Sequence, residues 1–201
     1  YSNNMAHAYH NKYDGYVLNS GFKENSANAM IGLNRSWGYS HLHLSAYRIM
    51  PGIVEGERDS LTGQFLKPVL VNGEEGFEVA GHSDFYSYSQ QIPYQDVNHY
   101  KAVLNNSFLI GKSTLKATIG WQQNRRKEFA DVSAPDQYGL YFYLNTINYD
   151  AKYILPVYKG LNLSFGVNGM QQSSQNRGTE FLVPEYNLFD AGIFAIARKS
   201  Y

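Results

Sequence analysis

Long segments of alternating apolar and polar residues divide the chain almost completely. The clearest segment covers residues 113–126. One parity of this segment is apolar and comprises Leu115, Ala117, Ile119 and Trp121. Successive side chains of a strand point to opposite faces, so this pattern predicts a β-strand with one apolar and one polar face.

Seven further segments alternate in the same way. They cover residues 2–11, 27–37, 41–50, 97–110, 138–153, 161–172 and 186–199. Their clearest apolar rows are Ala27, Ala29, Ile31, Leu33 and Trp37; Leu42, Leu44 and Ala46; Tyr100, Ala102, Leu104 and Phe108; Leu161, Leu163, Phe165 and Val167; and Ala191, Ile193, Ala195 and Ala197. The sequence therefore predicts about eight strands.

Short and long connections alternate between these segments. The short connections are residues 37–40, 111–113 and 156–160, and the long ones are about 12–25, 51–96, 127–137 and 173–185. Such alternation is typical of a transmembrane β-barrel with tight periplasmic turns and long extracellular loops. The segments also match or exceed the roughly 9–11 residues that a tilted strand needs to cross a bilayer. We expect one all-β unit over residues 1–201, built of antiparallel up-and-down β-hairpins of a transmembrane barrel.

The composition supports this fold class and excludes several functions. The chain holds 18 Tyr and 11 Phe beside 18 Gly, a combination that favours strands and turns. Its 17 basic and 17 acidic residues cancel, so nucleic acid is not an expected partner. Phosphate-binding loops, nucleophile elbows and paired metal-binding histidines on a helix do not occur, and we expect neither catalysis nor a resident metal or cofactor.

Several short stretches resemble the barrel region of TonB-dependent outer-membrane receptors. They read NKYDGY at residues 11–16, GLNRSWGY at 32–39, GERDSLTG at 56–63, GWQQNRRKEF at 120–129 and VPEYN at 183–187. The resemblance implies an outer-membrane location in a Gram-negative bacterium and uptake of a scarce nutrient, such as a ferric siderophore or similar iron complex. Its expected partners are that nutrient, outer-membrane lipid and TonB.

The resemblance also implies that the chain is an internal portion of a larger barrel. The sequence shows no plug-like region and no TonB box, so TonB would act only through parts outside this chain. A closing strand should carry alternating aromatics up to its end, whereas Tyr201 is preceded by Lys199 and Ala197. Two other hypotheses remain open: a complete eight-strand outer-membrane barrel, and a soluble β-sandwich or carbohydrate-binding module.

Candidate ligand-binding residues lie toward the expected extracellular end. Gln122, Asn124 and Arg126 share the polar parity of their strand and should line the inner wall. An inward Arg would suit an anionic ligand because it gives bidentate contacts. The alternative is a solvated loop base, or an ion pair of Arg126 with Glu128.

Loop residues supply the other candidates. Tyr86 and Tyr88, beside Phe85, could form a stacking platform for a flat or sugar-like ligand, or could pack the loop against its neighbours. His82 in the longest connection and His99 near the top of a strand are the only hint of haem ligation.

Overall fold

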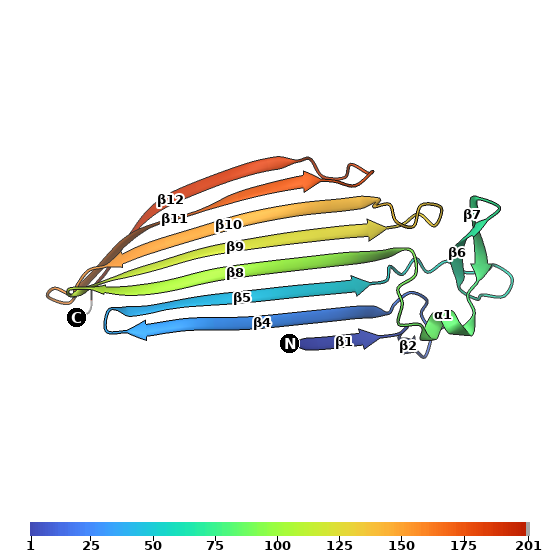
Figure 1. Ribbon diagram of the computed structural model, residues 1–201, viewed down its shortest axis with the longest axis horizontal. Helices are drawn as coiled ribbons and strands as arrows, with labels where there is room; N and C mark the ends of the chain where they lie inside the picture. The colour runs from blue at the N-terminus through green and yellow to red at the C-terminus, as the bar shows by residue number, and fades with distance from the viewer. Residues whose placement is uncertain (200–201) are drawn as a thin grey trace.

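One antiparallel sheet of eight strands makes up most of the molecule, for which a computed structural model describes residues 1–199 (Figure 1). The strands, in sheet order, are β1 (Ser2–Ala6), β4 (Phe22–Arg35), β5 (Gly38–Pro51), β8 (Tyr94–Ile110), β9 (Ser113–Phe129), β10 (Leu140–Ile154), β11 (Leu161–Asn176) and β12 (Tyr186–Lys199). This order follows the chain, so the predicted all-β, antiparallel, up-and-down arrangement is confirmed. The sheet is open, with β1 and β12 at its edges.

The strand boundaries differ from the predicted ones mainly at the end with the long connections. The first predicted segment, residues 2–11, yields a strand only as far as Ala6. Conversely, β4 begins at Phe22 and β11 continues to Asn176, inside predicted connections. Backbone pairing explains the extensions, because Phe22 pairs with both Ala6 and Pro51 even where the alternation has faded. Tyr201, the residue that bears on a closing strand, lies outside the described residues.

The long connections contain elements that the alternation did not indicate. The first holds the two-residue strands β2 (His10–Asn11) and β3 (Gly15–Tyr16). The longest holds the hairpin of β6 (Leu66–Val71) and β7 (Glu74–Val79), followed by the helix α1 (His82–Tyr86). Asn72 and Gly73 turn this hairpin with φ of 53° and 87°, the conformation that Asn-Gly favours.

The short turns all lie at one end of the sheet and the long connections at the other, as the sequence predicts (Figure 1). Gly38 begins β5 with φ of 130°, where a Cβ atom would lie 1.8 Å from the carbonyl oxygen of Ser107. Only glycine permits this close approach of β5 to β8. Glycine at this position is therefore required for the register in which Gly38 pairs with Phe108.

The register brings every predicted apolar row onto the same side of the sheet. One row of directly paired residues crosses seven strands through Ile31, Leu42, Leu104, Ile119, Tyr149, Gly169 and Ala191. We call this side the apolar face. The opposite side, which carries Thr118, Gln122 and Asn148, is the polar face. The predicted parities are confirmed and join into one surface.

Burial in this protein is inverted relative to a water-soluble fold. The buried apolar residues of the described chain are Ala8, Val17, Leu18 and Phe65, all in the connections. On the apolar face, by contrast, Ile193 is 89% exposed and Ile119 is 51% exposed. No described element packs against either side of the sheet.

The side chains buried on the sheet itself are polar. Thr146 on the polar face is 1% exposed, and its hydroxyl accepts a hydrogen bond from Gln172 Nε2 at 2.9 Å.

Within residues 1–199, no helix has the length and apolar character needed to cross a membrane.

Candidate ligand-binding site

The two connections at the β1–β8 side of the sheet pack together into a loop unit, which we define as residues 7–21 and 52–93. Its small core consists of Val17, Leu18 and Phe65, with Ala80 and Phe85 packed against them. Backbone bonds tie the two segments together, since Ala8 N–H donates to the carbonyl of Phe85 at 3.2 Å and Gly52 N–H donates to that of Gly21 at 3.0 Å. This core holds the loop residues in place above the end of the sheet.

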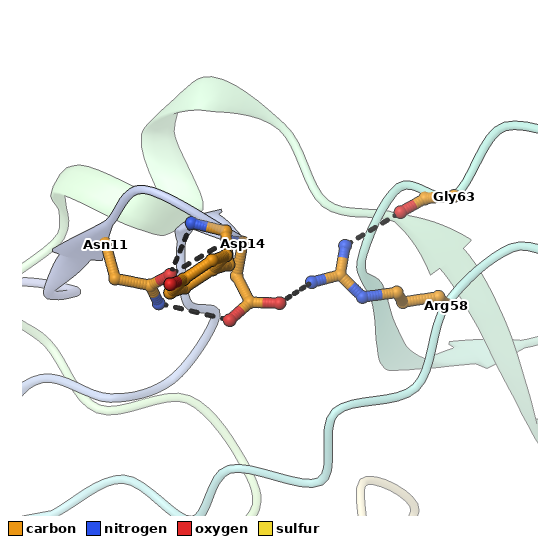
Figure 2. A network of polar contacts seen from close by, with 5 residues as sticks. Asn11, Asp14, Arg58 and Gly63 are labelled. Atoms are coloured by element: carbon orange, nitrogen blue, oxygen red, sulfur yellow. Dashed lines mark hydrogen bonds and ion pairs between the residues drawn. The ribbon is translucent and has the colours of Figure 1, made fainter.

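An ion pair joins the two connections within this unit (Figure 2). Arg58 Nη2 lies 3.1 Å from Asp14 Oδ1, and Arg58 Nη1 donates to the carbonyl of Gly63 at 2.8 Å. Asn11 shapes the β2–β3 turn, because its Oδ1 accepts from Asp14 N–H at 2.9 Å. Both charged side chains are substantially exposed, so the pair fixes geometry more than it adds stability.

Two polar side chains anchor the longest connection. Asn19 Nδ2 donates to the carbonyls of Ile53 at 3.0 Å and Pro93 at 2.6 Å, the two points where this connection leaves and rejoins the sheet. Asp84 accepts from Gly81 N–H, Lys67 and Gln91. Burial works to raise the pKa of the Asp84 carboxyl, but these donors outweigh it and lower the pKa below its ordinary value.

Five rings gather at the surface of the loop unit and form what we call the loop aromatic cluster: His7, Tyr16, His82, Tyr86 and Tyr88. Tyr86 is at its centre, with ring centroids 4.3 Å from His82, 4.9 Å from Tyr16 and 5.3 Å from His7. Tyr88 joins through His7 at 5.8 Å. Tyr86 and Tyr88 remain 40% and 46% exposed, so their rings are open to a ligand. The structure thus brings three sequence-predicted residues together.

Phe85 differs from its neighbours Tyr86 and Tyr88. It packs against the loop core beside Phe65 and so supports the cluster from below.

A hydrogen bond with Tyr16 raises the pKa of the Tyr86 phenol above its ordinary value, with burial adding to the effect. The Tyr86 phenol is therefore neutral at physiological pH.

The strand candidates form a second group on the polar face. Asn124 and His99 are directly paired across β8 and β9, and Asn124 Nδ2 lies 3.3 Å from His99 Nδ1. Gln122 lies on the same face, two residues along β9 toward the end with the short turns. These three polar residues line the same stretch of the wall as Arg126.

Arg126 is available for a ligand. Its register partners are Val97 and Phe142, and it takes part in no ion pair among residues 1–199. The alternative partner Glu128 instead accepts a hydrogen bond from Gln95 Nε2 at 2.8 Å. The proposed pairing of Arg126 with Glu128 is therefore wrong.

His82 and His99 do not converge. His82 stacks on Tyr86 in the loop unit, whereas His99 contacts Asn124 on the sheet. The described part of the chain contains no cluster of three or more His, Cys, Asp or Glu residues able to hold a metal ion. A haem would therefore meet one of these histidines, not both.

Sequence reasoning missed His7 and Tyr16 as members of the loop aromatic cluster. His7 lies in the first predicted strand segment and Tyr16 in a predicted connection, and both meet α1 across a sequence separation of 70 residues or more. Only the packing of the loop unit brings them together.

Comparisons with protein-family profiles, curated proteins and solved structures found no match for the chain.

Proposed function

We propose that this chain forms part of the barrel wall of a Gram-negative outer-membrane receptor that takes up a scarce nutrient. The observation that carries the proposal is the continuous, uncovered apolar face of seven long strands. In water such a face costs roughly 25 cal/mol for each Å² of apolar surface. Contact with lipid removes this cost, and membrane barrels direct their apolar parity toward lipid.

The height of the apolar face suits a bilayer. On β10, Tyr143 and Tyr153 lie ten residues apart on this face. That separation is about 34 Å along a strand, or about 25 Å across a membrane at a tilt near 45°. Tyr and Trp favour the two interfaces of a bilayer. Trp121 and Tyr100 lie on the same half of the sheet as Tyr143, toward the end with the long connections.

The two alternative architectures fit less well. A closed eight-strand barrel requires β1 to pair with β12, but β1 has 5 residues against 14 in β12, and each pairs with one neighbour. A β-sandwich requires a second layer over the apolar face, and the described residues supply none. The open edges favour a portion of a larger barrel.

The ligand side of the proposal rests on the polar face and the loop aromatic cluster. The strand candidates Asn124, Arg126 and His99 on the polar face lie toward the end with the long connections, as the cluster does, and a receptor exposes its binding groups at that end. Arg126 favours an anionic nutrient such as a ferric siderophore. The resemblance to TonB-dependent receptors supports energy supply through TonB, acting on the whole receptor.

Protease accessibility tests this orientation. A recognition sequence for a site-specific protease is inserted between Asn72 and Gly73, at the tip of the β6–β7 hairpin, or between Gly111 and Lys112, in a short turn. Protease added to intact cells should cut the first variant only. Disruption of the outer membrane should expose the second site. Cleavage at the Gly111 site in intact cells would contradict the proposed orientation.

A further inference from the structure

A cluster of three cations, Arg125, Lys127 and Arg177, lies on the apolar face, beyond the apolar rows at the end with the long connections. Arg125 and Lys127 continue the apolar parity of β9 past Trp121. Arg177 follows β11. Its backbone N–H donates to the backbone carbonyl of Tyr141 at 2.8 Å, which extends the hydrogen-bond ladder between β10 and β11. All three therefore lie on the side opposite Arg126, although Arg125 is its neighbour in sequence.

Aromatic rings hold these cations at the edge of the apolar face. The Tyr143 ring lies between two guanidinium groups, with Arg177 Cζ 3.9 Å and Arg125 Cζ 5.3 Å from its centroid. Lys127 Nζ lies 4.6 Å from the ring centroid of Tyr138 and 5.2 Å from that of Tyr141. Cation–π contacts orient a charge without neutralising it.

These charges have no anionic partner within residues 1–199. Arg125, Lys127 and Arg177 form no ion pair there. Asp96, the register partner of Lys127, is held instead by Arg48, whose Nε and Nη2 donate to its two oxygens at 2.9 Å each. Glutamine side chains accept hydrogen bonds from both guanidinium groups. Arg125 Nε donates to Gln123 Oε1, and Arg177 Nη2 donates to Gln175 Oε1.

We propose that Arg125, Lys127 and Arg177 bind the phosphate group of an anionic lipid in the leaflet at the long-connection end. The site combines two guanidinium groups and an ammonium with the phenols of Tyr138 and Tyr141. The apolar residues Trp121 and Ile147 lie on the same face, four residues along their strands from Arg125 and Tyr143, with Gln123 and Asn145 between. Arg matches phosphate with paired hydrogen bonds, and acyl chains would lie along the apolar rows. This inference rests on the proposed function, because it requires the apolar face to lie in lipid.

Lipid quenching tests the proposal on the full-length receptor in phosphatidylcholine vesicles. Ile147→Cys is labelled with bimane, since this chain has no native cysteine and Ile147 lies beside Trp121 on the apolar face. Phosphatidic acid with brominated acyl chains is compared with phosphatidylcholine carrying the same chains. We expect a relative association constant at least about fivefold in favour of phosphatidic acid.

The variant R125Q/K127Q/R177Q should abolish this preference, whereas Arg126→Gln on the opposite face should keep it. If the triple variant does not fold, Arg177→Gln alone should reduce the preference, because Arg177 is exposed and lies beyond the end of β11. Equal quenching by both lipids in the wild type, or an unchanged preference in the charge variants, would overturn the lipid site. A bimane quenched by neither lipid would instead overturn the proposed membrane location.

Discussion

The sheet and the loop unit of this protein obey opposite rules of burial. In the loop unit, apolar residues such as Val17 and Phe65 are buried and polar residues such as Asp14 are exposed. On the sheet, apolar residues such as Ile119 are exposed and the buried residues, such as Thr146, are polar. The loop unit therefore resembles a small water-soluble fold, whereas the sheet requires an apolar environment.

The difference shows that two kinds of interaction stabilise one chain. The loop unit depends on a hydrophobic core, an ion pair and a few anchoring side chains. The sheet depends on continuous backbone pairing between strands of up to 17 residues, together with whatever covers its apolar face. Changes to one region should therefore leave the other largely intact, and four sets of substitutions test the difference between the two regions.

Removal of the loop core should have the largest effect. Phe65→Ala takes a large ring from the centre of the core, which should lower the opening free energy of the loop unit by about 3 kcal/mol or more. Native-state hydrogen exchange measures this at the amides of Val17 and Ala80, which are bonded within the unit. The amide of Ile119 serves as the control. Equal loss of protection at Ile119 would mean that the sheet and the loops unfold together.

Charge insertion into the apolar face should come next. Ile119→Lys should destabilise the receptor in lipid by roughly 2–4 kcal/mol if the residue lies near the bilayer midplane. Thr118→Lys, one residue away on the polar face, should cost far less, although it removes a hydrogen bond to Asn105 Oδ1 at 3.0 Å. Urea titration of folding into vesicles measures both. Equal costs would contradict a lipid-facing Ile119.

Ligand binding should separate Arg126 from Arg125. For an anionic ligand, Arg126→Ala should weaken binding by roughly 1.5–3 kcal/mol, the scale of a charge-assisted hydrogen bond. Lys at position 126 should restore only part of the lost binding free energy, because its ammonium group cannot make the two parallel hydrogen bonds of a guanidinium group. Arg125→Ala, on the opposite face, should leave binding unchanged. The measurement is a titration of the full receptor with a ferric siderophore.

The histidines are titrated alongside. A loss confined to His82→Ala and His99→Ala would favour haem as the nutrient. Unchanged affinity in every variant would place recognition outside the residues that we assign to it.

Acid should weaken the loop unit by the smallest amount. The pKa of Asp84 is lowered in the folded state, so its contribution is complete above the unfolded pKa of roughly 3.9. It is lost as the pH falls through the folded pKa, and the effect should be small because the Asp84 side chain is partly exposed to solvent. Hydrogen exchange at Ala80 against pH should show this decline. Asp84→Asn should flatten it, whereas Asp131→Asn, in the connection at 130–139, should not.

The alternation of the sequence was sufficient to predict the sheet. Backbone geometry gives strands a period of two, so the parity of Ile119 and Thr118 fixed their faces before any contact was known. The candidate site was predicted only in part. Parity placed Asn124 and Arg126 on the polar wall, but the contact of Asn124 with His99 required the register of β8 and β9.

The loop unit shows what local pattern does not determine. The Asn72-Gly73 pair could have revealed the β6–β7 hairpin, because both residues tolerate positive φ. No comparable signal predicts that His7 meets Tyr86, since that contact depends on packing between two connections.

By itself, the sequence determined the strands, their two faces and the end at which the long connections lie, because these follow from local periodicity and turn chemistry. Tertiary structure decided which rows join into one apolar face, which aromatic rings gather above the sheet, and that Arg125 and Arg177 share the ring of Tyr143. The reason is that pairing register and loop packing depend on residues far apart in the chain, whose meeting no local pattern encodes.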